Sequence, residues 1–421
     1  MDAVARPHAL IVNTWIRAMR ALPIAAMLSL ILCSSVGAQT NVPKRPSLAA
    51  GADTCDAAAY LDEGMRVLER DPWRAADDFY WAARIDPTSA DALLARRVAL
   101  LMTDAPRLAA YMNRNRRALE NKTVRQIDSL QYRALTMNPF VYRGLEKNLF
   151  FAYMRNEYEQ DARMAGEQLD VALLSIWIEK ALRTASPSMR AWAAYGSREF
   201  GGALDAYAAA IKHDKENSYL HAQRGRTFFL VGSFDSAMAE TRQALAMMRE
   251  RDEKKLVYVY ESKALYEHSI GLLLEARGDL AGARDAYGRA LQEDLSYYPA
   301  HVRTAALALR TGDTASAVAA MQLAAQIRPD DPAVLVSYGE LLVAMGRPAD
   351  AELPLRHARE VNPVYADPHF LLARALEAQG KAAAAAAEYR AFLDRAARGH
   401  RRRGQAEARV RALAPAAQEN R

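Results

Sequence analysis

The sequence predicts an all-α fold, an α-solenoid of stacked helix-turn-helix repeats, from two periodic features. The first is a series of alanines spaced by 34, 46, 34, 34 and 34 residues: Ala203, Ala237, Ala283, Ala317, Ala351 and Ala385. The second is a glycine that precedes five of these alanines by five residues: Gly232, Gly278, Gly312, Gly346 and Gly380. A unit of this length holds two helices of roughly 12 to 15 residues and their turns.

Residues 1–38 have the features of a secretion signal. Arg17 and Arg20 precede an apolar run over 21–32, and small residues follow up to Ala38. The run is too short to span a bilayer comfortably. The sequence therefore predicts cleavage after Ala38 and an exported protein, periplasmic or secreted. An uncleaved membrane anchor and lipidation at Cys33 stay open as alternatives.

Three segments are expected between the signal and the main array. Residues 39–52 are predicted to be a disordered linker. Residues 53–120 are predicted to hold N-terminal repeats, because a unit from Asp56 to Pro87 carries small and aromatic residues at the spacing of the later units. In 121–183 the period is lost, but the apolar spacing predicts an irregular helical segment.

The array is predicted over 184–395. In each unit the glycine ends the first helix, since it adopts left-handed backbone without a Cβ penalty. A larger residue four positions after each key alanine lies on the same helix face: Tyr207, Thr241, Tyr287, Met321, Leu355 and Tyr389. Asp331 and Asp367 each precede a proline and are predicted to cap a first helix. The 46-residue step predicts lengthened helices around 249–262.

The positive charge is concentrated at the C-terminus. The chain carries +6, and residues 390–421 alone carry nine arginines against three acidic residues, which leaves the repeats nearly neutral. Residues 396–421 are therefore predicted to form a basic C-terminal helix and tail. Such a segment is typical of a solvated cap. The alternative is that its arginines contact an anionic membrane or polymer, through Arg401, Arg402 and Arg403. A nucleic acid partner is not expected.

The unit from Pro332 to Pro363 resembles the tetratricopeptide repeat. It has the family's large, small and aromatic residues in the family's order: Leu335, Tyr338, Gly339, Leu342, Gly346, Ala351, Leu355, Ala358 and Pro363. The resemblance extends over 184–393. It implies a right-handed solenoid whose first helices line a concave groove for a partner.

No pattern in the sequence indicates catalysis, a cofactor or a metal. The eight histidines form no i,i+4 pair, and there is no phosphate-binding glycine loop, nucleophile elbow or paired-cysteine motif. His221, His301 and His369 occupy a position where the family packs a bulky residue, which predicts a packing role. The sequence therefore favours a non-catalytic protein. An enzyme with an unrecognised site in 121–183 is the remote alternative.

The resemblance also implies which residues line the groove. Carried over position by position, they are Trp192, Tyr195, Tyr219, Arg226, Phe229, His268, Leu272, Glu275, Leu309, Arg310, Val336, Glu340, Phe370, Arg374 and Glu377. Aromatic and aliphatic side chains with arginines suit a protein or peptide segment. We therefore expect an exported scaffold for envelope assembly or secretion. The alternative is a membrane-associated structural module docked through its arginine-rich end.

Overall fold

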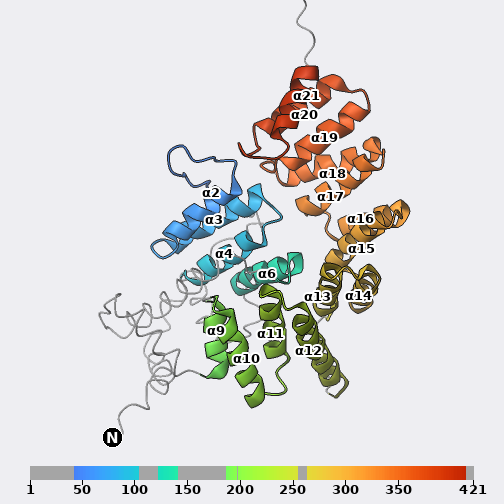
Figure 1. The fold of residues 1–421 in the computed structure, drawn as a ribbon. Helices are drawn as coiled ribbons and strands as arrows, with labels where there is room; N and C mark the ends of the chain where they lie inside the picture. Colours follow the sequence, from blue (N-terminus) through green and yellow to red (C-terminus); the bar gives the residue numbers. More distant parts are fainter. Residues whose placement is uncertain (1–41, 104–121, 141–185, 197, 255–262, 414–421) are drawn as a thin grey trace, which may run out of the picture. The chain divides into compact units, whose positions relative to one another are not determined.

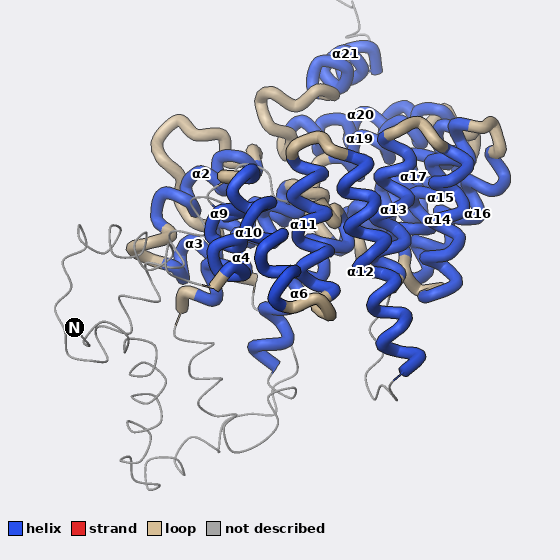
Figure 2. Tube along the Cα trace, turned by 60° about the horizontal axis from the view of Figure 1, so that its bottom comes forward, coloured by secondary structure: helices blue, strands red, loops and turns tan. Residues whose placement is uncertain are grey.

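The computed structural model describes residues 42–103, 122–140, 186–196, 198–254 and 263–413 (Figure 1). These residues contain helices and no strands, joined by short loops (Figure 2). The described residues from Lys44 onward belong to one compact unit. No helix among them is long and apolar enough to cross a membrane. The predicted signal, 1–38, lies outside the described residues.

The array consists of six helix pairs, each packed against the next. The pairs are α9 (Pro187–Gly196) with α10 (Phe200–His213), α11 (Ser218–Leu230) with α12 (Phe234–Lys254), α13 (Ala264–Ala276) with α14 (Leu280–Glu293), α15 (Tyr298–Arg310) with α16 (Thr314–Ile327), α17 (Pro332–Ala344) with α18 (Pro348–Val361), and α19 (Asp367–Ala378) with α20 (Ala382–Leu393). A last helix, α21 (Arg403–Leu413), packs on α20. The predicted all-α solenoid of stacked pairs is confirmed.

An N-terminal pair precedes the array. It consists of α2 (Ala57–Val67) and α3 (Pro72–Ile85), followed by α4 (Ala90–Leu101) and α6 (Lys122–Met137). The preceding loop contacts this pair, because the Arg45 guanidinium lies over the Trp81 ring and its Nε donates to the Tyr60 hydroxyl at 2.8 Å. Most of the predicted irregular segment lies outside the described residues.

The repeated glycines terminate the first helices by a shared hydrogen-bond pattern. All five adopt left-handed backbone, with φ between +70° and +81°. In each case the amide after the glycine donates back to a carbonyl in the last turn, as Asp313 N does to Ala308 O at 2.9 Å. In the α9–α10 turn Arg198 takes this place with φ +61°. The chain reversal therefore requires left-handed backbone at this residue, and glycine adopts that conformation without strain.

Close packing within a pair depends on the small residues. All six key alanines are fully buried. In three pairs a glycine on the first helix faces the larger residue on the second, so that a Cβ on Gly271 would lie 2.3 Å from the Tyr287 ring. Gly339 faces Leu355 in the same way. This complementarity fixes how the two helices of a pair are aligned.

Two details of the prediction have different outcomes. The 46-residue step is accommodated in part by α12, which has 21 residues where the equivalent second helices have 12 to 14. Asp331 caps α17 by accepting from Val334 N and Ala333 N. The capping prediction for Asp367 is wrong, because α19 begins at Asp367 itself and its carboxylate accepts from Arg402 instead. The carboxylate pairs with the Arg402 guanidinium and not with the first amides of the helix.

Candidate functional site

The predicted partner-binding residues divide into three groups, according to what contacts them. Four are core residues and present little surface: Tyr195, His268, Val336 and Phe370. Four are covered or paired by other parts of the chain: Phe229, Glu275, Glu340 and Glu377. Six retain accessible surface: Tyr219, Arg226, Leu272, Leu309, Arg310 and Arg374. Trp192 lies on α9, but its side chain is outside the described part.

His268 illustrates why a residue in the first group is not a ligand or a base. Only 2% of its surface is exposed, and its ring packs against those of Tyr287 and Tyr297, with centroid separations of 5.5 and 5.4 Å. Burial, with the nearby charge of Arg303, lowers the pKa of His268 to about 3. The imidazole is therefore neutral at physiological pH and serves as packing.

The three histidines of the packing prediction also have partners within their own surroundings. His221 Nδ1 lies 2.7 Å from Glu240 Oε2, and His369 Nδ1 lies 2.6 Å from Glu388 Oε2, at equivalent places in two repeats. His301 Nε2 lies 3.0 Å from the Leu295 carbonyl. No group of histidine, cysteine and acidic side chains in the described residues has the geometry to hold a metal.

At the α11 end, an aromatic residue from outside the array covers the predicted face. Phe140, just after α6, stacks on Phe229 with ring centroids 3.9 Å apart. It is buried and joins the core cluster that contains Ile270 and Leu273. Sequence reasoning missed Phe140, because it lies where the period is lost.

At the α19 end, arginines from the C-terminal segment cover the predicted face. Arg402 donates to Glu340 at 2.6 Å and to Asp367 at 3.1 Å, and its guanidinium lies 5.2 Å from the centroid of the Phe370 ring. Arg409 of α21 pairs with Glu377, which also accepts from the Tyr389 hydroxyl at 2.9 Å. The side chain of Arg402 is only 12% exposed as a result.

The three arginines predicted to form an anionic-surface contact differ in their surroundings. Arg401 is exposed. Arg402 is engaged with Glu340 and Asp367, and Arg403 donates to the Leu393 and Ala396 carbonyls at 3.0 Å each. Their contact with a membrane or polymer stays a prediction.

Between these two ends, α13 and α15 present an accessible surface of mixed character, which we call the α13–α15 face. It comprises Leu272, Glu275, Leu309 and Arg310. Leu309 and Arg310 are 41% and 51% exposed. Glu275 joins the two helices, because it accepts from Arg303 at 3.2 Å and from Arg310 at 3.5 Å. On α11, the first helix of the preceding pair, Tyr219 is 58% exposed, and Arg226 has no hydrogen bond or ion pair with any described residue.

Family models identify the repeats. Tetratricopeptide repeat models match residues 308–363 and, in a second form, 268–332 and 339–400. The chain is a tetratricopeptide-repeat protein. Members of this family are typically non-catalytic scaffolds, and the repeats make this chain a protein-interaction scaffold.

Three solved structures that are similar to this chain are the following. One is YrrB, described as a tetratricopeptide-repeat protein with an unusual peptide-binding site, at 17% identity and a TM-score of 0.36, covering 45% of this chain and 92% of that one. Yeast Tom70 has 14% identity and a TM-score of 0.43, with 85% and 88% covered. PilW, a type IV pilus biogenesis factor, has 19% identity and a TM-score of 0.38, with 49% and 91% covered. A search of curated proteins found no significant match.

Proposed function

We propose that this tetratricopeptide-repeat protein binds a protein segment on the α13–α15 face, extended by Tyr219 and Arg226 of α11. The observation that carries the proposal is the exposure of Leu309 beside Arg310 on a first helix, where most neighbouring positions are buried or covered. An exposed leucine supplies apolar area to bury, and a guanidinium pairs with carboxylates or peptide carbonyls.

Contacts made by other parts of the chain on α11 and on α19 limit where a partner fits. Phe140 already occupies the surface of Phe229, and Arg402 occupies that of Phe370. A segment bound at either place would first have to displace a packed side chain. The α13–α15 face demands no such displacement, apart from rearrangement of the long Arg310–Glu275 contact.

Site-specific photo-crosslinking tests this proposal. A photoreactive residue in place of Leu309 should give discrete adducts with a protein in an extract of the source organism. Leu353 on α18 is the matched control, because it is also an exposed leucine, at 78%, but lies on a second helix. Adducts from position 353 that equal those from position 309 would refute the assignment of the face.

Charge reversal provides a second test. Arg226→Glu with Arg310→Glu should weaken binding of the crosslinked partner while leaving helical content unchanged. Arg390→Glu on α20 is the control, since Arg390 is an exposed arginine on a second helix. Equal affinity of the wild-type and doubly reversed proteins would exclude the arginines from recognition.

We also propose that the protein is exported and acts in envelope assembly or secretion. The support is the sequence of residues 1–38, with its basic, apolar and small-residue regions. N-terminal sequencing of the protein from fractionated cells is the test. A mature N-terminus at Gln39 in the exported fraction supports export, and an intact N-terminus in the cytoplasm contradicts it.

A further inference from the structure

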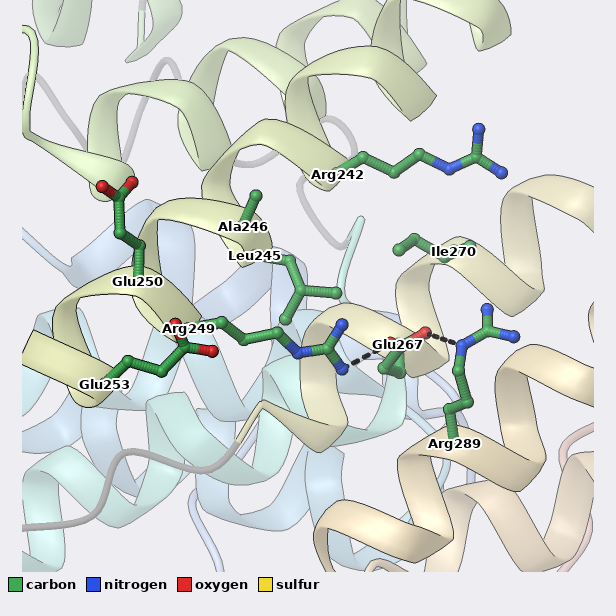
Figure 3. A pocket seen from close by; sticks show the side chains of 9 residues that line it. All are labelled: Arg242, Leu245, Ala246, Arg249, Glu250, Glu253, Glu267, Ile270 and Arg289. Carbon is green, nitrogen blue, oxygen red and sulfur yellow. Dashed lines mark hydrogen bonds and ion pairs between the residues drawn. The ribbon is translucent and has the colours of Figure 1, made fainter.

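A pocket of about 460 Å³ is lined by residues other than those of the proposed binding face. It is bounded by α12, α13 and α14 (Figure 3). Three arginines line it: Arg242 and Arg249 from α12 and Arg289 from α14. A pocket of this size is within the range of ligand sites, and its chemistry is set by these arginines.

A buried carboxylate orients two of the arginines. Glu267 of α13 is 1% exposed and accepts from Arg249 Nη2 at 2.8 Å and from Arg289 Nε at 2.9 Å. Arg249 also donates to Glu293 at 3.1 Å. Because Arg289 uses Nε for Glu267, its two terminal nitrogens, which point away from Glu267 in Figure 3, remain available to a ligand. Such a fixed guanidinium loses little side-chain entropy when it binds a ligand.

The third arginine adds a charge that nothing in the described structure neutralises. Arg242 is exposed, and its guanidinium makes no hydrogen bond or ion pair with any described residue. Figure 3 shows the guanidinium groups of Arg242 and Arg289 on either side of Ile270. Two guanidinium donors that line one pocket suit a carboxylate ligand.

The opposite end of the pocket is acidic. Glu250 and Glu253 line it near the C-terminal end of α12, and Glu250 is paired with Lys254. Arg242 and Glu253 are separated by eleven residues of helix, roughly 16 Å along the axis. An extended peptide covers that length in about five residues. The acidic end also repels a continuous polyanion, which argues against nucleic acid.

We propose that this pocket is a second binding site, for a protein segment with an acidic residue near Arg242 and Arg289 and a basic residue about five positions away near Glu253. Between these two ends the pocket is lined by the exposed Ala246 and by the buried Leu245 and Ile270, so Ala246 offers the segment its apolar contact. The site is independent of the α13–α15 face and uses different helices for its charged contacts.

Selection from a display library of random dodecapeptides on the full chain tests this proposal. The expected result is enrichment of peptides that combine an acidic and a basic residue at that separation. Their affinity, measured by fluorescence anisotropy, should fall at least about tenfold in Arg242→Ala, because a charge-assisted contact is lost. Glu253→Lys should abolish the preference for the basic residue and keep that for the acidic one. Both substituted side chains are exposed, so the fold should be unaffected.

Controls separate this site from the proposed binding face. Arg390→Ala, at an exposed arginine on α20, should bind the selected peptides like the wild type, and so should Arg226→Glu with Arg310→Glu. The proposal is overturned if no peptide is enriched, if the enriched peptides lack acidic residues, or if Arg242→Ala binds them unchanged. A single-stranded oligonucleotide that binds in an Arg242-dependent manner, with no peptide enriched, overturns it as well.

Discussion

The contact between Gly271 and Tyr287 gives a sharp test of how the two helices of a repeat fit together. Gly271→Ala would place a methyl group 2.3 Å from Cε1 of Tyr287 and 2.6 Å from its Cδ1. The ring has no room to retreat, because it is fully buried and its hydroxyl donates to Glu275 at 2.8 Å. Overpacking of this kind costs about 1–3 kcal/mol.

Gly288→Ala is the matched control. Gly288 lies inside the partner helix α14, and a Cβ there meets nothing within 4 Å. Each substitution gains the same helix propensity, about 1 kcal/mol, so this gain cancels when the two variants are compared. We expect Gly288→Ala to be more stable than the wild type, and Gly271→Ala to lie about 1–3 kcal/mol below Gly288→Ala.

Urea unfolding followed by circular dichroism, with hydrogen exchange of α13 and α14 amides, is the assay. Exchange is needed because repeat arrays can unfold in parts. Adding Tyr287→Met to Gly271→Ala reproduces the Ala305 and Met321 combination of the next repeat. The double variant should be less destabilised than the sum of the single variants, by 0.5 kcal/mol or more. Equal stabilities of Gly271→Ala and Gly288→Ala would refute the packing argument.

Three further predictions concern the backbone, a buried charge and the C-terminal contact. Arg198→Gly should raise the free energy of unfolding by about 1 kcal/mol, since glycine tolerates φ +61°. Gly312→Ala should lower the free energy of unfolding. A urea midpoint that Arg198→Gly leaves unchanged would contradict the left-handed backbone at this residue. Burial raises the pKa of Asp78 to about 7, although Arg74 lies nearby. Between about pH 4 and 7 the folded state therefore keeps a proton on Asp78 that the unfolded state releases. The free energy of unfolding of the wild type should fall with rising pH across this interval, by up to about 4 kcal/mol. Asp78→Asn should remove that pH dependence in urea unfolding at pH 5 and pH 8, and an unchanged difference between the two pH values would assign it to other groups. Arg402→Gln should lower the free energy of unfolding by about 1–3 kcal/mol, because Glu340 and Asp367 lose their cation, while Arg401→Gln, at an exposed arginine, should have little effect; equal melting temperatures would contradict this.

The repeat fold could be predicted because it depends on small residues at regular intervals. The key alanines, the turn glycines and the larger residues opposite the first helices all recur in sequence, and packing demands each of them locally. Arg198 shows the limit of this reasoning. In the α9–α10 turn Arg198 has left-handed backbone and the next amide donates back to Ala194 O, as after the glycines, but the residue type that signals this turn is absent.

The candidate binding face could be predicted only in part, because its coverage comes from segments without the period. The positional rule selected Phe229 and Phe370 correctly as first-helix residues. It could not show that Phe140 stacks on one and that the Arg402 guanidinium lies over the other. Asp367 failed as a cap for the same reason, since its competing partner Arg402 lies 35 residues further along the chain.

The Arg402 contact also indicates what the first-helix surface can recognise. A guanidinium over an aromatic ring, with carboxylates at its edge, is a favourable arrangement for a cation that is largely removed from water. The chain itself supplies that cation at α17 and α19, so a basic partner segment would have to exchange with a tethered competitor. On the α13–α15 face the carboxylate of Glu275 is held by Arg303 and Arg310, and Arg310 is half exposed. A partner carboxylate can therefore approach Arg310 without expelling a buried group. This difference in displacement cost is why we expect binding to begin there.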